Sequence, residues 1–504
     1  MKKHRILSAA LAAALAAASI FTTAWAEPAT LKEARELLMQ SEIEAFESSY
    51  DAKLDAQEAS MKGSNAKLTL TVEQPAKDLL SMIFPLDLSW LKDITFDAKA
   101  SIKDHKTVSL AQGLVNDTPV ISMNVMMDME SLDYFTAVPT LTDGVLKANY
   151  EDVIALSLEQ ANEDLPFTAE QITSLMKVMF SFIENPPAAA DITKIINKYG
   201  AILLDMGEDV ELTPDTVTVE GISQELLTAE QKITATQAQE TVLAVLSALQ
   251  EDEQLRDLYT SYAEDASSYD TFMESIKELY DNVANEDMTD ETMLLVLRCW
   301  FDADANLAGL ALSQDEDGYI TPFVTCLAPS TEDAAALSIV AGEDENFSLV
   351  GSGTIADGML SGSYLASFEG EPVADIAVTD YAVDAYKENA FSGTYNITVA
   401  GTEQIPFLSN LGITVDVDTT AEGGNFDLTV NSNGTPLLTL RSEAAISDEP
   451  VDYEVPADAP IYDFTKEEDI EAFNSSVDPS PIFTNLMEAG MPEDFLESIF
   501  SMFG

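Results

Sequence analysis

The sequence predicts an α+β protein built on a large, curved antiparallel β-sheet, half-barrel-like, with helices packed on one face. In two long regions, residues 64–160 and 291–445, apolar and polar residues alternate over short segments. This period of two is typical of strands with one buried and one solvated face. Residues 161–290 follow the helical period instead. We therefore expect a helical block inserted between two portions of one sheet.

The first 26 residues have the pattern of a signal peptide. Lys2, Lys3 and Arg5 precede an apolar run rich in alanine and leucine, which ends at Ala24-Trp25-Ala26. We expect cleavage after Ala26 and a secreted or extracytoplasmic location; the alternative is a short membrane anchor. No later apolar run reaches the ~18 residues of a spanning helix, so the sequence predicts no integral membrane span after cleavage.

The mature chain is expected to begin with a helix over residues 27–63, because Thr30 and Glu33 have the spacing of a capping box. Residues 64–160 then supply the first portion of the sheet, with alternating segments near residues 68–72, 94–102, 108–110, 121–129 and 134–138. The apolar stretch Leu79–Leu91 is interrupted by Pro85. It predicts a short helix and a loop over the sheet or its open end.

The block 161–290 is expected to consist mainly of helices. Thr168 and Gln171 form one predicted capping box, and Thr236 and Gln239 form another. Between these helices, the segments at residues 216–219 and 225–234 predict a short strand pair.

Residues 291–445 are expected to complete the sheet as a β-meander. The segment 293–301 alternates without interruption, and acidic turns at residues 302–306 and 317–318 separate it from two more strands. Arg298 lies within this first strand beside Trp300, where we expect it to extend toward solvent or to pair with a carboxylate on the outer face; the alternative is contact with an anion or ligand. Residues 446–504 are expected to form a linker followed by C-terminal helices. Thr465 and Glu468 form the predicted capping box of the first of these helices.

The two cysteines, Cys299 and Cys326, fall on the first and third strands of this meander. Strands separated by a middle strand lie roughly 10 Å apart, whereas a disulfide needs Cα atoms within about 7 Å. The sequence therefore predicts two buried free thiols.

The net charge of −65, from 24 basic and 89 acidic residues, narrows the range of partners. Such a surface repels nucleic acid and anionic lipid headgroups. We expect a highly solvated exported protein with no nucleic-acid partner.

The sequence assigns no catalytic residue, metal site or cofactor. His105 is the one histidine that remains after signal cleavage, and it lies in a polar turn. The turns at 302–306 and 313–320 resemble the start of calcium-binding loops, but Leu307 stands where the first needs glycine and Ser313 where it needs a closing acid. Both turns are therefore interpreted as hairpin turns.

One group of apolar residues is a candidate lining for a ligand cavity. Methionine adapts to irregular apolar ligands, although a methionine-rich sheet face under a helix is also ordinary core. The candidate lining residues are Met82, Phe84, Trp90, Met123, Val125 and Met127.

Several short motifs carry a resemblance: Leu88–Leu91, Tyr134–Pro139, Leu294–Gly309 and Asn485–Gly490. With these, the chain resembles a family of uncharacterised exported proteins, often lipid-anchored, from anaerobic gut bacteria. The lipid-anchor cysteine of that family is missing here. The expected architecture is also distantly similar to the lipoprotein-carrier (LolA/LppX-like) half-barrel. Neither resemblance implies a catalytic activity.

These observations leave three functions open. The first is a non-enzymatic structural or interaction role in the cell envelope or outside the cell, with an unknown partner. The second is a carrier of an apolar or lipid-like ligand in a half-barrel cavity. The third is a carboxylate-based hydrolase, because carboxylates are abundant, but no pair of them stands out.

Overall fold

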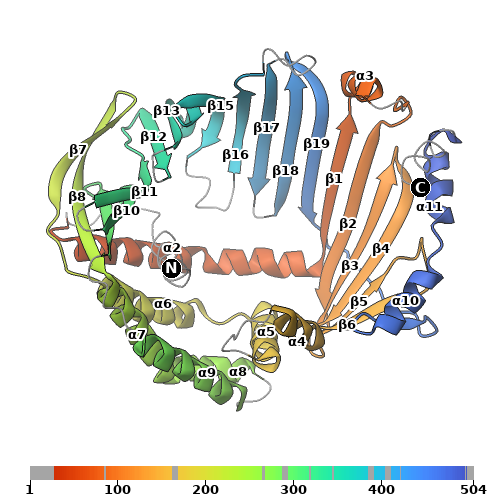
Figure 1. Cartoon of the computed structure of the whole chain (residues 1–504), viewed down its shortest axis with the longest axis horizontal. Coiled ribbons are helices and arrows are strands. Elements are labelled where there is room, and N and C mark those ends of the chain that lie inside the picture. The colour runs from red at the N-terminus through yellow and green to blue at the C-terminus, as the bar shows by residue number, and fades with distance from the viewer. Residues whose placement is uncertain are drawn as a thin grey trace. The chain divides into compact units, whose positions relative to one another are not determined.

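The computed structural model describes residues 28–83, 87–161, 168–263, 267–286, 293–316, 319–342, 346–383, 391–402, 410–420, 422–493 and 495. The protein is α+β with a large, curved antiparallel sheet, as the sequence predicts (Figure 1). Its elements divide between two compact units. Unit 1 contains the described residues of Met1–Asp51, Pro187–Ser261 and Tyr269–Ala377, and unit 2 those of Ala52–Pro186, Tyr262–Ser268 and Val378–Gly504.

Unit 1 holds most of the helical block and the first part of the later meander. Its helices are α2 (Leu31–Lys62, which ends in unit 2), α6 (Ala189–Leu204), α7 (Ala235–Gln250), α8 (Glu253–Tyr262) and α9 (Ser267–Ala284). Its strands are β7 (Thr213–Val219), β8 (Ile222–Thr234), β9 (Met293–Phe301), β10 (Leu307–Glu316), β11 (Tyr319–Leu327), β12 (Ala334–Ala341), β13 (Phe347–Ala356), β14 (Met359–Phe368) and β15 (Glu371–Ala382, which ends in unit 2).

Strand β9 has both faces buried. On one face, Leu297, Cys299 and Phe301 pack against Leu31 and Leu38 of α2. On the other face, Trp300 packs with residues of β7, β8 and β12, because β7 contacts β12 and β13 and so covers this side. The near-continuous apolar sequence of β9 follows from this double burial.

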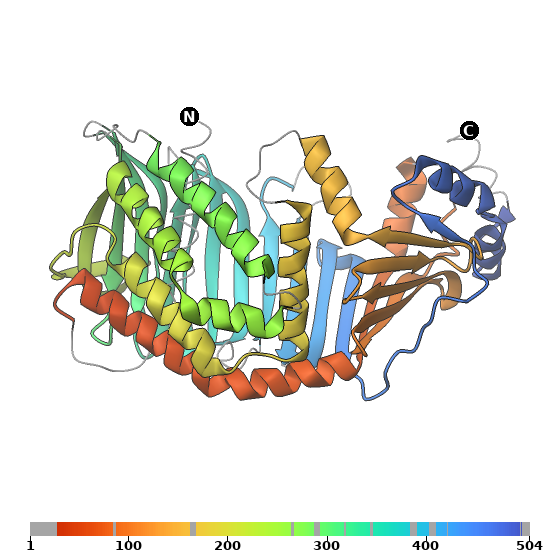
Figure 2. The same ribbon diagram turned by 90° about the horizontal axis from the view of Figure 1, so that it is seen from below.

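The helices of unit 1 pack on the face of β9 that α2 covers. α2 and α6 lie side by side (Figure 2), and the Thr193 hydroxyl of α6 donates a hydrogen bond of 2.8 Å to Glu47 of α2. Gly200 lets the two helices approach closely, since a Cβ atom there would stand 2.5 Å from the sulfur of Met39. α7 contacts α6, β8 and β9.

Unit 2 contains the first strands of the chain and the last ones. Its helices are α3 (Gln74–Ile83), α4 (Tyr150–Ala161), α5 (Ala169–Glu184), α10 (Glu467–Ser476) and α11 (Ser480–Glu488). Its strands are β1 (Ser64–Val72), β2 (Asp93–Lys103), β3 (Lys106–Val115), β4 (Thr118–Asp128), β5 (Asp133–Ala137), β6 (Val145–Asn149), β16 (Phe391–Val399), β17 (Leu411–Thr420), β18 (Gly423–Ser432), β19 (Thr435–Ile446) and β20 (Ile461–Asp463).

The strands of unit 2 pair in the order β16–β17–β18–β19–β1–β2–β3–β4–β5–β6–β20. All of these pairs are antiparallel except β6–β20, which is parallel. Strand β1 therefore joins the N-terminal strands to the C-terminal ones. Helix α3 packs at the β1–β19 end, where Ala76 contacts Val72 and Leu437. The helix expected within Leu79–Leu91 is the last part of α3, which begins earlier, at Gln74; residues 84–86 lie outside the described residues.

One face of this sheet is apolar and open. Cross-strand pairing aligns Leu68 with Phe96, Phe96 with Gly113, and Gly113 with Ile121, and alternation places further apolar side chains beside them. Phe96 is 47% exposed, Leu68 40% and Ile121 38%. We call this surface the apolar face; it consists of Leu68, Leu70, Ile94, Phe96, Ile121, Met123, Val125 and Met127.

The opposite, more polar face of unit 2 is partly covered. Ser101, only 2% exposed, donates a hydrogen bond to the carbonyl of Val451 and accepts one from its amide, both at 3.0 Å. Residues 447–460 therefore cross this face as the linker that the sequence predicts. Asn485 of α11 donates a hydrogen bond to the carbonyl of Val120 in β4, which holds this helix against the sheet.

The helix starts confirm some capping predictions and correct others. Thr168 and Gln171 form the predicted capping box of α5. The prediction for α7 is wrong by two residues: Thr234, where β8 ends, is the cap and pairs with Gln237. The prediction for α10 is wrong as well, because the Thr465 hydroxyl donates to Asp463 instead of capping the helix.

The cysteines are free thiols, as predicted, but only Cys299 is buried; the prediction of burial is wrong for Cys326, which is partly exposed. Leu310 of β10 is the cross-strand partner of both Cys299 and Cys326, so a whole strand separates them. Among the helices that the structure describes, none combines the length and apolar character needed to cross a membrane.

Candidate functional site

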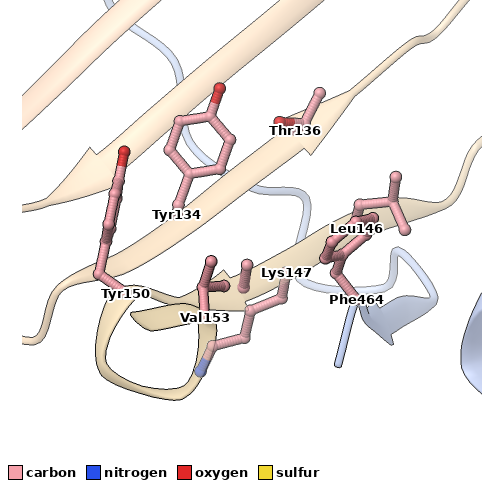
Figure 3. A pocket seen from close by; sticks show the side chains of 8 residues that line it. Tyr134, Thr136, Leu146, Lys147, Tyr150, Val153 and Phe464 are labelled. Atoms are coloured by element: carbon pink, nitrogen blue, oxygen red, sulfur yellow. The ribbon is translucent and has the colours of Figure 1, made fainter. Parts of the chain in front are cut away.

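A pocket of about 340 Å3 opens over β5 and β6 of unit 2 (Figure 3). Its volume lies at the lower end of the range of small-molecule sites, roughly 300–1,000 Å3. Most of the lining is aromatic or aliphatic. The lining residues are Tyr134 and Thr136 of β5, Leu146, Lys147 and Ala148 of β6, Tyr150 and Val153 of α4, and Phe464.

The strand registers explain how this lining forms. Thr136 lies opposite Leu146, and Tyr134 lies opposite Ala148, so these four side chains share one face of the sheet. Strand β6 runs directly into α4 at Tyr150, and the first turn of that helix brings Val153 over the strands. The strand pair β5–β6 thus forms the floor of the pocket, and the first turn of α4 forms one wall.

Phe464 completes the wall from the far end of the chain. Its backbone amide donates a hydrogen bond of 2.8 Å to the carbonyl of Lys147. The preceding residue, Asp463, fixes the turn into α10: hydrogen bonds from Thr465, with the ammonium of Lys466 nearby, lower the pKa of its carboxyl group to about 2. Asp463 is therefore ionised at neutral pH and positions Phe464 through the backbone.

The polar atoms of the pocket are mainly hydroxyl groups. The rings of Tyr134 and Tyr150 meet edge to face, with centroids 6.2 Å apart. The hydroxyls of Tyr134 and Tyr150 lie on the side of the pocket away from Leu146 and Phe464, and Thr136 lies between the two sides, next to its cross-strand partner Leu146 (Figure 3). Lys147 also reaches the lining, but its ammonium lies 2.7 Å from Asp133.

The pocket continues the apolar face. Val125 of β4 lies opposite Thr136, and Met127 lies opposite Tyr134. Met123 follows on the same strand and is 37% exposed. The structure therefore brings three of the proposed lining residues, Met123, Val125 and Met127, beside the pocket, although none of the three lines it.

The other proposed lining residues are placed elsewhere or not described. Met82, in α3, is 70% exposed. Trp90 packs edge to face on Phe495, at a centroid distance of 5.6 Å, near the cluster of Val115, Val120 and Ala489. Phe84 lies outside the described residues. Met82 and Trp90 thus do not join the three β4 residues in one lining.

Sequence reasoning missed the residues that build the pocket itself. Tyr134 and Thr136 belong to a predicted strand, and their alternation was the available signal. Strand β6 and helix α4 were not individually predicted, so Leu146, Tyr150 and Val153 were overlooked. No local pattern connects Phe464 to β6, because that contact depends on the pairing of β20 with β6.

The remaining sequence candidates have structural roles. Arg298 donates a hydrogen bond of 3.1 Å to Asp215 and stacks over Trp300, which confirms the expected carboxylate pairing. His105 lies at the β2–β3 turn with its Nδ1 atom 2.6 Å from the carboxylate of Glu184 in α5. Asp302 accepts hydrogen bonds from the amides of Asp304 and Asn306 and so closes its own hairpin turn.

The two thiols are poor candidates for a nucleophile. Burial raises the pKa of both Cys299 and Cys326, which disfavours the nucleophilic thiolate. Within the described ranges, no three His, Cys, Asp or Glu side chains are grouped to hold a metal ion.

Comparisons of the chain with protein-family models, curated proteins and solved structures find no match.

Proposed function

We propose that this protein is a non-enzymatic, extracytoplasmic binding protein for a small apolar, lipid-like molecule, which binds in the pocket over β5 and β6 and along the adjoining apolar face. The export part of this proposal rests on the signal-peptide pattern of residues 1–26. The binding part rests on the geometry of unit 2.

The observation that carries the proposal is the continuity of the two surfaces. The pocket shares the sheet face with Met127, Val125 and Met123, and the same face extends to Phe96 and Leu68. Exposing large apolar side chains to water costs about 25 cal/mol per Å2 relative to burial. An exposed apolar patch of this kind marks a binding surface, and a pocket at its edge favours a small ligand over a flat protein partner.

A fluorescence titration tests the proposal. Purified protein beginning at Glu27, freed of lipid, should bind the neutral apolar dye Nile red with a blue shift and a saturating increase in emission. Leu146→Arg places a charge in the pocket and should weaken binding at least about tenfold, since an unpaired charge is poorly tolerated in an apolar site. Phe464→Ala removes one wall and should also weaken it.

The matched control is Gln112→Arg, which adds the same charge to the opposite face of the sheet, in register with Asp97 and Ser122. It should bind the dye like the unmodified protein. Circular dichroism identifies any variant that fails to fold. Saturable binding that Leu146→Arg and Phe464→Ala leave unchanged, or no binding at all, contradicts the proposal. The second result together with capture of one defined envelope protein would support the interaction role instead.

A further inference from the structure

We infer that the ligand carries an uncharged, hydrogen-bonding head group, such as the glycerol of a monoacylglycerol, and that Tyr134 and Tyr150 bind this head while the apolar part lies toward Leu146 and Phe464. This inference rests on the proposed function and specifies its ligand class.

The first argument is the separation of polar and apolar atoms within the pocket. The hydroxyls of Tyr134 and Tyr150 lie on one side of the pocket and Leu146 and Phe464 on the other, with Thr136 between them (Figure 3). A ligand that fills this pocket must therefore be amphiphilic to match both parts. A plain hydrocarbon would leave the hydroxyls without a partner.

The second argument is that the two tyrosine hydroxyls are available. Among the described residues, neither the Tyr134 nor the Tyr150 hydroxyl has a hydrogen-bond partner, and both side chains are partly exposed. A phenolic hydroxyl donates one hydrogen bond and accepts others. Two of them side by side suit a group that also donates and accepts, such as an alcohol, an ester or an amide.

The third argument is that the charged groups at the pocket are already paired. Lys147 is bound to Asp133 at 2.7 Å, and its ammonium lies 5.6 Å from the centre of the Phe135 ring. The second oxygen of Asp133 accepts a hydrogen bond of 3.0 Å from Asn149. An anionic or a cationic head would have to break this pair to find a counter-charge among the lining residues.

The net charge of −65 adds a separate, long-range effect. It repels anionic heads and attracts cationic ones, but salt weakens it, because the Debye length falls to ~3 Å at 1 M salt. Hydrogen bonding to the tyrosines does not depend on salt in this way. A preference for neutral heads that persists in high salt therefore reports on the pocket itself.

Three competitors with the same alkyl chain length test the inference: glycerol monolaurate, laurate and dodecyltrimethylammonium. Each should be titrated below its micelle concentration against bound Nile red, at low and at high salt. Glycerol monolaurate should displace the dye at concentrations about tenfold lower than either charged competitor at high salt, as expected for two hydrogen bonds.

The Tyr134→Phe/Tyr150→Phe double variant removes both hydroxyls and keeps both rings. The Kd of this variant for Nile red is measured first and used to convert dye displacement into competitor affinity. On that basis the preference for glycerol monolaurate should shrink to about twofold or less. Tyr395→Phe, on β16 of the same unit, is the matched control and should keep the full preference.

The outcomes separate the two proposals. Equal or tighter binding of laurate or dodecyltrimethylammonium at high salt would overturn the neutral-head inference and leave apolar binding intact. The same holds for a neutral-head preference that survives in the double variant. Failure of Nile red and all three competitors to bind would overturn the proposed function, and this inference with it.

Discussion

Strand β9 of unit 1 and strand β2 of unit 2 carry similar apolar side chains but differ in what covers them. In β9, Leu297 is 2% exposed and Phe301 1%, because α2 packs on the face that carries them. Strand β7 covers the other face of β9. In β2, Ile94 is 43% exposed and Phe96 47%. The difference shows that β9 uses these side chains as core, whereas β2 leaves comparable side chains exposed to solvent.

The largest expected effect comes from truncating a phenylalanine in each strand. Phe301→Ala should lower the free energy of unfolding by about 3–5 kcal/mol, through lost burial and a cavity. Phe96→Ala should cost about 1 kcal/mol or less, since the side chain is half exposed. Urea denaturation measures both: Trp300 reports on unit 1 in a Trp90→Phe background, and Trp90 reports on unit 2 in a Trp300→Phe background. Equal losses would remove the contrast between the units.

A smaller contrast is expected between two ion pairs. Asp215 accepts hydrogen bonds from Arg298 and from the Trp300 indole, the latter at 2.9 Å, and Trp300 is only 6% exposed. Asp215→Ala leaves a buried indole donor unpaired and should cost about 1–3 kcal/mol. Asp427→Ala breaks the exposed Arg441 pair of unit 2 and should cost about 1 kcal/mol or less. A costlier Asp427 variant in the same denaturation assay would contradict this order.

The smallest expected effect concerns pH and the Asp463 turn of unit 2. The carboxyl pKa is lowered to about 2 in the folded protein, against about 3.9 in an unfolded chain. Its stabilising contribution is present above about pH 4 and is lost as the pH falls toward 2. The effect should be about 1 kcal/mol or less, because the side chain is 32% exposed.

Thermal unfolding across that pH range measures this contribution. The melting temperature of the Asp463→Asn variant should be slightly lower than that of the unmodified protein at pH 6, and the two values should converge near pH 2. A constant difference at every pH would mean that ionisation of Asp463 contributes nothing.

Sequence reasoning predicted the architecture better than the site. Alternation in β9, β2 and β4 is long enough to identify the strands and to separate their faces. The spacing of strands in a sheet then predicts that Cys299 and Cys326 are too far apart to form a disulfide. Helix starts are harder to predict. Both Thr234 and Thr236 have the sequence pattern of an N-cap for α7, and only the residue at which β8 ends decides between them.

The pocket depends on pairings that alternation does not encode. Whether the face of Met123 and Val125 is covered depends on α4 and on Phe464, and the latter reaches β6 from more than three hundred positions along the chain. Methionine content drew attention to β4, which lies beside the pocket, but it gave equal weight to Met82, which is 70% exposed.

The pairing of β1 with β19 has a consequence for the assembly of the protein. Ser64 aligns with Ile446, so β1 lacks one neighbour until nearly the whole chain is available. In synthesis or transport that starts at the N-terminus, Leu68 and Phe96 emerge long before that partner. Contacts between residues so distant in sequence slow folding. Until β19 is available, the unpaired edge of β1 promotes aggregation. We therefore expect unit 2 to refold more slowly than unit 1.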